Sequence, residues 1–187
     1  MPMFDTDEFI STCLEASRET ESIPALSEVV SRAISMNASL NLRFPIPLDP
    51  DDDGILLQSP GLTIASAIFP RGFSTGVHNH TMPAIIGVWT GTEDNVIFEK
   101  AVHGVVAVDS IRVQAGQVLS LASDAIHDVH VPSSSWSGAL HVYLGDLIGV
   151  KRSEWSEPLM EESPFDGENL HEKWLAGARE TGLVAIP

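Results

Sequence analysis

The feature that most constrains the fold is a long series of short segments rich in Val, Ile and Thr between Leu40 and about Leu147. Segments of this kind, separated by Gly, Pro, Asp and Asn, are typical of antiparallel sandwiches and barrels. The central part of the chain is therefore predicted to be mainly β. We expect strands at residues 62–69, 75–80, 84–90, 94–102, 104–108, 111–114, 117–121, 126–131 and 138–144.

The two ends of the chain have a different pattern. Residues 5–36 carry apolar side chains at helical spacing, with Asp5 or Thr6 as a cap for a first helix and Pro24 in the first turn of a second. The polar and aromatic tail is expected to wrap the barrel, with a short helix at 168–180. We expect a single domain of 187 residues, with N-terminal helices at 1–38, a barrel at 40–147 and a C-terminal wrap at 148–187.

Composition narrows the possible partners. The chain has 10 basic and 26 acidic residues, for a formal net charge of −16. Nucleic acids and anionic membranes bind basic patches, so we expect neither as a partner. No segment approaches the roughly 18 apolar residues of a membrane helix, and residues 1–10 lack the apolar part of a signal peptide. We therefore expect a cytoplasmic protein. The acidic run at 49–54 lacks the spacing of a calcium loop and is interpreted as a solvated turn.

Three of the seven histidines have the spacing of a metal site. His78 and His80 form a His-x-His pair, and His127 follows 47 residues after His80. Alternate side chains of a strand point to the same face, so a strand would present both imidazoles of the pair together. Two such imidazoles, with a third from another strand, can bind a divalent transition metal. We expect the other histidines to have no such role, with His103 in a turn, His130 at the surface or in packing, and His171 on a solvated helix.

The sequence around these histidines resembles the cupins, which are small jelly-roll barrels. The glutamate of the first cupin motif falls at Ala84 or Ile85, so the resemblance implies a three-histidine site without a carboxylate ligand. Three neutral ligands leave the full charge of a divalent metal uncompensated. A barrel that kept its histidines but lost its metal is the alternative. The residues that match the two motifs are Gly72, His78, His80, Gly91, Gly116 and His127.

The last expected strand narrows this resemblance. Segment 139–143 resembles the Ser-x-His-x-Tyr motif of the thiol dioxygenases, the family of cysteine dioxygenase and 3-mercaptopropionate dioxygenase, and the resemblance covers roughly residues 60–160. It implies Fe(II) bound by the three histidines, with His141 and Tyr143 beside the metal. Ala139 stands in the position of the serine, so the hydrogen bond that the serine would make to His141 is lost.

The position of an arginine separates the branches of that family. In the 3-mercaptopropionate branch it follows the tyrosine by nine residues, which here gives Arg152. Arginine is suited to bidentate binding of a carboxylate. The resemblance therefore implies that a small thiol carboxylate and dioxygen are the substrates, that the product is a sulfinate, and that Fe(II) is the cofactor. A surface position is the alternative for Arg152.

Several alternatives remain open at this stage. The chain could be a cupin oxygenase or hydrolase acting on a non-thiol molecule, or a metal-free cupin that binds a ligand or a partner. Zinc or nickel could replace iron in a purified sample, because imidazole suits several metals. The sequence does not fix the oligomeric state, and a homodimer is one option.

Overall fold

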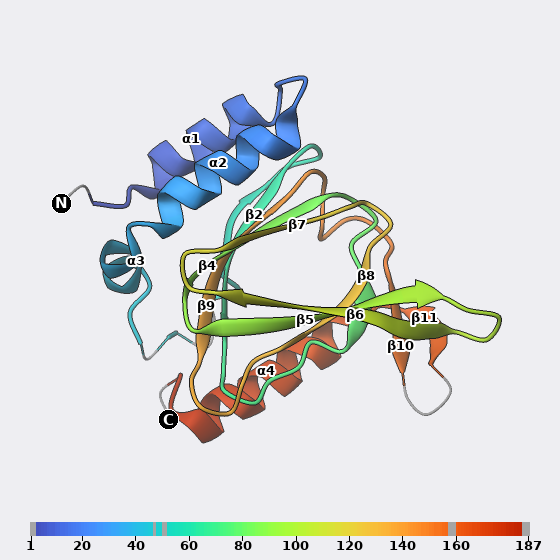
Figure 1. The fold of residues 1–187 in the computed structure, drawn as a ribbon. Coiled ribbons are helices and arrows are strands. Elements are labelled where there is room, and N and C mark those ends of the chain that lie inside the picture. The colour runs from blue at the N-terminus through green and yellow to red at the C-terminus, as the bar shows by residue number, and fades with distance from the viewer. Residues whose placement is uncertain (1–2, 47, 50–51, 157–159, 185–187) are drawn as a thin grey trace.

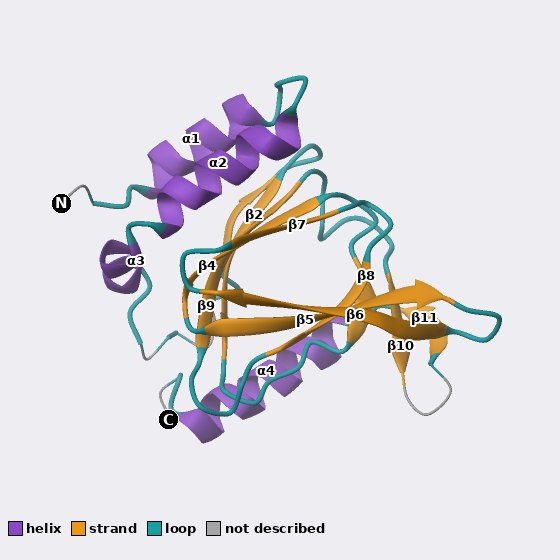
Figure 2. Cartoon of the chain, in the orientation of Figure 1, coloured by secondary structure: helices purple, strands orange, loops and turns teal. Residues whose placement is uncertain are grey.

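The computed structural model describes residues 3–46, 48–49, 52–156 and 160–184, and its elements are mainly strands, with helices near both ends of the chain (Figure 2). The helices are α1 (Thr6–Ala16), α2 (Ser22–Ile34), α3 (Asn37–Arg43) and α4 (Gly167–Thr181). The Asp5 side chain caps α1 by accepting hydrogen bonds from the backbone N–H groups of Asp7 and Glu8, as the sequence predicted.

Two antiparallel sheets form the body of the molecule (Figure 1). From β2 to β10 the chain alternates between the two sheets, apart from the hairpin of β5 and β6, and the pairs β1–β2 and β10–β11 each stay within one sheet. Strands β2, β9, β4 and β7 face strands β3, β8, β5 and β6, which is the arrangement of a jelly-roll barrel. The prediction of a cupin-type jelly roll with N-terminal helices is therefore confirmed. In spatial order, the first sheet is β1 (Ile55–Gln58), β2 (Thr63–Phe69), β9 (Ser137–Tyr143), β4 (Ala84–Thr90) and β7 (Val118–Leu121), and the second is β11 (Glu161–Pro164), β10 (Ser153–Ser156), β3 (Val77–Asn79), β8 (Ile126–His130), β5 (Thr92–Lys100) and β6 (Val105–Gln114).

The first sheet is covered on both faces, which explains why β4 is almost entirely apolar. Ile85 and Trp89 point outward and pack in the cluster that includes α1 and α2, whereas Ile86 and Val88 point into the barrel. Gly87 lies on the outer face, where an added Cβ would lie 2.3 Å from Cγ1 of Val30. The absence of a side chain at this position therefore lets α2 approach the sheet closely.

The second sheet is more exposed, and it accounts for one error in the sequence analysis. Residues 104–108 and 111–114 were expected to be separate strands, but β6 is continuous and pairs with β5 along its length. Asp109 and Ser110 resemble turn residues in the sequence. They are tolerated within the strand because most of β6 faces solvent.

Other elements were not predicted. Helix α3 extends the helical region past the expected boundary at residue 38 and into the segment assigned to the barrel. Strands β10 and β11 lie in the tail that was expected only to wrap. Both are short and polar, with Trp155 as the buried side chain of β10, so they carry little hydrophobic pattern. Strand β1 was also missed.

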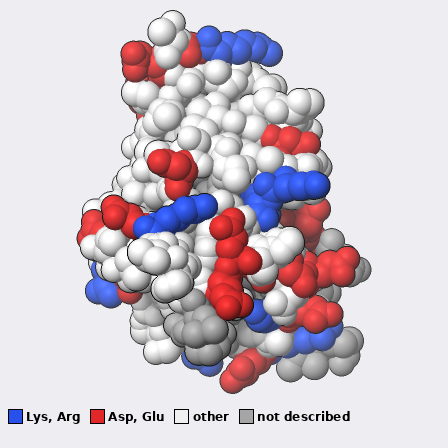
Figure 3. Space-filling model, turned by 90° about the vertical axis from the view of Figure 1, so that its right-hand side faces the viewer, with Lys and Arg blue, Asp and Glu red and all other residues white. Residues whose placement is uncertain are grey.

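Charged side chains are spread over the surface. On the face shown in Figure 3, Asp and Glu are interspersed with Lys and Arg. Asp52 and Asp53 of the acidic run are exposed, while residues 50 and 51 lie outside the described part of the chain. Among the described residues, no helix has the length and apolarity needed to cross a bilayer.

Candidate metal centre

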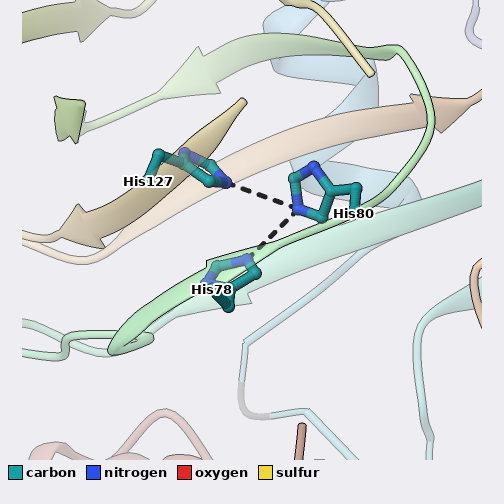
Figure 4. A group of neighbouring side chains, drawn as sticks. All are labelled: His78, His80 and His127. Atoms are coloured by element: carbon teal, nitrogen blue, oxygen red, sulfur yellow. Dashed lines mark hydrogen bonds between the residues drawn. The ribbon is translucent and has the colours of Figure 1, made fainter. Parts of the chain in front are cut away.

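His78, His80 and His127 converge inside the barrel. His78 on β3 is paired directly with His127 on β8, and His80 follows the end of β3 on the same face as His78. Their ring centroids lie 4.8–5.0 Å apart, and one nitrogen of each ring lies within 4.8 Å of the others. Figure 4 shows the rings directed toward one another from the two strands. The prediction that these three side chains form one cluster is confirmed.

Hydrogen bonds set the orientation of two of the rings. Nδ1 of His78 lies 2.9 Å from the carbonyl oxygen of Gly76, and Nδ1 of His127 lies 3.0 Å from Oδ1 of Asn95. Both oxygens can only accept, so each Nδ1 carries the proton and each Nε2 presents a lone pair to the shared centre. This is the arrangement that second-sphere hydrogen bonds give to metal-binding histidines.

The distances between the Nε2 atoms fit a common metal ion. The Nε2 atom of His80 lies 3.1 Å from that of His78 and 3.4 Å from that of His127. Imidazole nitrogens about 2.1 Å from a tetrahedral metal are separated by roughly 3.4 Å. Two of the three separations are thus compatible with one divalent ion, and the ligand nitrogens of His78 and His127 lie within 4.8 Å of each other.

The environment keeps these imidazoles neutral. All three are buried, with exposed fractions of 6% for His78, 4% for His80 and 1% for His127. Burial lowers the pKa of His78 to about 4 and lowers the pKa values of His80 and His127 well below their ordinary value. Neutral imidazole is the form that binds a metal. No carboxylate of the described residues joins the cluster, in agreement with the apolar Ala84 and Ile85.

His141 and Tyr143 lie beside this cluster. Both point from β9 into the barrel, with 2.8 Å between Nδ1 of His141 and the hydroxyl of Tyr143, and the Tyr143 ring centroid is 4.9 Å from that of His80. Burial lowers the pKa of His141 to about 4 and raises the pKa of Tyr143 above its ordinary value, so both groups are neutral. The buried Nε2 of His141 has no partner among the described residues, which is consistent with Ala139 in place of a serine.

Arg152 lies in the same pocket. It immediately precedes β10, and continuing the pairing of Glu154 with His78 places Arg152 opposite His80. Its guanidinium stacks on Phe165, with Cζ 3.8 Å from the ring centroid. Burial lowers the pKa of Arg152 below its ordinary value. No carboxylate of the described residues pairs with this cation.

A cavity of about 340 Å³ joins these groups. The rest of its wall is mostly apolar, although the exposed Asp52 and Asp53 also border it. The side chains with polar groups that line it include His78, His80, His127, His141, Tyr143 and Arg152. The cavity therefore connects a candidate metal centre, a hydrogen-bonding pair and a cation.

The remaining histidines lie outside the cluster. His130 is exposed, and its Nε2 lies 2.7 Å from a carboxylate oxygen of Asp128. His103 is exposed in the connection between β5 and β6. His171 is exposed on α4, as expected, but it also borders the cavity and stacks on Trp174 at a centroid distance of 5.7 Å.

The sequence analysis missed Asn95, Glu93 and Ser137. Glu93 is fully buried and accepts a hydrogen bond of 3.0 Å from the Ser137 hydroxyl, while its second oxygen has no partner among the described residues. Burial raises the pKa of Glu93 to about 7. The segment Glu-Asp-Asn resembles an exposed strand, and only the alternation of Glu93 and Asn95 against Asp94 indicates that two of the three point inward.

Comparisons with known proteins add little to this description. No family model and no curated protein matches the sequence. A cupin protein from Bacteroides fragilis is 24% identical, covers 46% of this chain and 68% of its own, and gives a TM-score of 0.38. The DMSP lyase DddQ from Ruegeria pomeroyi is 20% identical, covers 49% of this chain and 42% of its own, and gives a TM-score of 0.40. The Cnp3 cupin domain of Schizosaccharomyces pombe is 10% identical, covers 49% of this chain and 59% of its own, and gives a TM-score of 0.41.

With TM-scores this low, the assignment of the fold rests on the strand order rather than on these likenesses. The strand order and the histidine cluster together define the class of protein. It is a jelly-roll protein of cupin type with a candidate three-histidine metal centre.

Proposed function

We propose that this protein is a non-haem Fe(II) dioxygenase that uses three histidine ligands to oxidise the thiol of a small carboxylate to a sulfinate. The observation that carries the proposal is the presence, in one cavity, of a carboxylate-free histidine cluster and a cation without a carboxylate partner among the described residues. Both atoms of dioxygen are transferred to sulfur, so that one thiol and one dioxygen give one sulfinic acid.

The three histidines suit a metal that must bind an anionic substrate. They contribute no negative charge, so a thiolate can supply the charge that a carboxylate ligand supplies in other sites. The iron, when bound, provides a site at which a thiol loses its proton and dioxygen is activated. Zinc or nickel could occupy the same ligands in a purified sample.

Arg152 is assigned to the substrate carboxylate. A partly buried cation is costly without an anionic partner, so a guanidinium without a carboxylate partner among the described residues favours binding of an anion from solution. Its planar geometry allows two parallel hydrogen bonds to one carboxylate. Stacking on Phe165 holds the guanidinium in place.

Tyr143 and His141 are assigned to the reacting end of the substrate. If Nδ1–H of His141 donates to the Tyr143 oxygen, the phenol O–H is free to donate into the cavity. The raised pKa of Tyr143 keeps that proton in place at neutral pH. Its hydrogen bond would orient the sulfur or the oxygen that reacts with it.

The direct test is oxygen uptake by protein loaded with Fe(II) under anaerobic conditions. Cysteine, 3-mercaptopropionate and cysteamine form a panel in which the last lacks a carboxylate. We expect uptake with a carboxylate-bearing thiol, equal molar formation of sulfinate, and little reaction with cysteamine. Absence of uptake with every thiol would reject the proposal.

A second candidate is an oxygenase or hydrolase of a non-thiol small molecule. The observation that favours it is Ala139, which leaves His141 Nε2 without the hydrogen bond expected in a thiol dioxygenase. Metal analysis of the purified protein separates both enzymes from a metal-free binding module, because only the enzymes require a stoichiometric metal.

A further inference from the structure

We infer that the ligand of this cavity carries an apolar arm, of the size of a phenyl ring, in addition to its carboxylate. The inference rests on the proposed function for the placement of the carboxylate at Arg152 and of the reacting end at the three histidines. It adds the substrate class, which is an aryl- or alkyl-substituted thiol carboxylate rather than an unsubstituted three-carbon acid.

The first observation is the size of the cavity. Its volume of about 340 Å³ falls within the range of roughly 300–1,000 Å³ found for sites that bind drug-sized molecules. An unsubstituted three-carbon thiol acid is far smaller than this volume. The remaining space therefore leaves room for a further group on the ligand.

The second observation is the chemistry of the remaining wall. The rings of Phe69 and Phe73 are stacked with centroids 5.2 Å apart, and Phe69 also meets His141 edge-on at 6.2 Å. The apolar wall thus begins next to the His141–Tyr143 pair. Its apolar side chains include Phe69, Phe73, Leu147, Ile148, Leu170 and Trp174.

The third observation explains why the space is open. Ala65 and Ala67 lie on the inner face of β2, opposite His141 and Ala139 of β9, and both alanines line the cavity. A larger residue at Ala67 would project into the volume next to the aromatic wall. Two consecutive inward positions with single methyl groups therefore create room beside the reacting end.

The fourth observation concerns the cover of the cavity. Helix α4, red in Figure 1, lies on a different side of the barrel from α1 and α2. Its Trp174 indole donates a 2.7 Å hydrogen bond to the carbonyl of Ile68, and Gly177 lies so close to Pro70 that an added Cβ would be 3.2 Å from the proline ring. The helix is thus fixed against β2, and its apolar residues close the wall.

These observations together favour a ring or a branched alkyl group. Aromatic side chains bind another ring in offset or edge-to-face geometry. An apolar arm would bury its surface against the wall while its carboxylate pairs with Arg152. A purely polar ligand of the same size would leave its polar groups without partners along this wall.

The test measures binding of acids that lack a thiol, so that no oxidation can occur. Propanoate and 3-phenylpropanoate are titrated calorimetrically into the purified protein, with its metal content determined. We expect 3-phenylpropanoate to bind at least about tenfold more tightly, because a phenyl ring is buried against apolar side chains. Equal affinities for the two acids would overturn the inference.

A matched pair of variants locates the effect. Ala67→Leu fills the space and should weaken binding of the phenyl acid much more than binding of propanoate, which removes the preference. Ala107→Leu places the same side chain on an exposed part of β6 and should have no effect. Should Ala67→Leu fail to fold, Phe73→Leu is compared with Phe98→Leu, which lies outside the cavity. A preference that survives both cavity variants would overturn the inference.

Oxygen uptake then separates this inference from the proposed function. The two thiols to compare are 3-mercaptopropionate and 2-benzyl-3-mercaptopropanoate, which keep the same spacing between carboxylate and thiol, and we expect the second to have the higher kcat/KM. Oxidation of the first with exclusion of the second would overturn the inference and leave the proposed function standing. Absence of oxidation of either, with Ala67-dependent binding of 3-phenylpropanoate, would reject thiol oxidation and leave the inference standing.

Discussion

Asn95 orients one residue of the candidate metal centre without joining the cluster itself. Its Oδ1 accepts the Nδ1 proton of His127 inside the barrel, and so fixes both the tautomer and the ring plane. We predict that Asn95→Leu weakens metal affinity by about 10–100-fold, the range found for loss of such partners. Competition with a chromophoric chelator measures this. Asp94→Asn, on the outer face of the same strand, is the control and should leave the affinity unchanged.

The two histidines of β8 give a second prediction. His127 is buried in the cluster, whereas His130 is exposed and contacts Asp128. His127→Ala should lose most of the bound metal, because one of three ligands is removed and no other described residue can replace it. His130→Ala should retain the wild-type stoichiometry. Metal analysis after dialysis checks both. Equal retention by the two variants would place the metal elsewhere.

Arg152 and Tyr143 are predicted to affect different kinetic constants. Removing a partly buried charge-assisted pair costs on the order of 2–5 kcal/mol of binding. If that pairing is equally strong in the ground and transition states, Arg152→Ala raises KM more than it lowers kcat. Arg152→Lys should rescue it only partly, because lysine lacks the two-pronged geometry. Tyr143→Phe should lower mainly kcat. Oxygen uptake at varied thiol concentration distinguishes the two effects. An unchanged KM in Arg152→Ala for every carboxylate-bearing thiol would show that Arg152 does not bind the carboxylate.

Among the helices, α4 lines the cavity through Leu170, His171 and Trp174. The hydrogen bond from Trp174 to Ile68 is a tertiary link between this helix and β2. Trp174→Phe keeps an aromatic ring but removes the donor, so we predict faster amide hydrogen exchange in α4 with little change in the barrel strands. Glu172→Ala, at an exposed position of the same helix, is the control. Uniform acceleration across the barrel would contradict a local role for this bond.

The predictability of each element follows from its hydrophobic pattern. Strands β2, β4 and β9 were found because both faces of their sheet are covered, which makes their sequences strongly apolar. Strands β10 and β11 were missed because their sequences are polar, and because β10, which pairs with β11, joins the sheet through β3, a partner far away in the chain. Such pairing cannot be predicted from the local sequence of the strand.

The same reasoning applies to the site. The cluster of His78, His80 and His127 could be predicted because histidine spacing along strands translates directly into a shared face. The buried Glu93 and Asn95 could not, because their inward direction depends on the register of β5 against β8. The position of Arg152 in the cavity depends likewise on the pairing of β10 with β3.

For the molecule as a whole, Glu93 makes stability depend on pH. Burial raises the pKa of Glu93 from 4.5 to about 7 in the folded state. Below the pKa of the unfolded state, the carboxyl is protonated in both states and does not change the free energy of unfolding. As the pH rises toward 7, the carboxyl ionises first in the unfolded state. This ionisation lowers the free energy of the unfolded state, so the free energy of unfolding decreases. Above about pH 7 the carboxyl is ionised in both states, and the loss of stability no longer changes with pH.

Replacing Glu93 with the neutral isostere should remove this dependence. We predict that Glu93→Gln is more stable than the wild type at pH 8 by on the order of 3 kcal/mol, and that the difference shrinks toward pH 4. Gln keeps an acceptor for the Ser137 hydroxyl. Denaturant unfolding at several pH values measures the difference. Glu99→Gln, exposed on the same strand, is the control, and an identical pH profile for all three proteins would contradict the prediction.

The pairing of β10 with β3 has a geometric consequence for the ligand. The ladder pairs Glu154 with His78, and the Ser153 N–H donates to the Asn79 side chain just beyond that pair, so the register of β10 against β3 places Arg152 beside the histidine cluster. A slip of the ladder by two residues would move the guanidinium by about 7 Å. The register of the two strands therefore sets the distance between Arg152 and the histidine cluster, and with it the length of a ligand that can contact both.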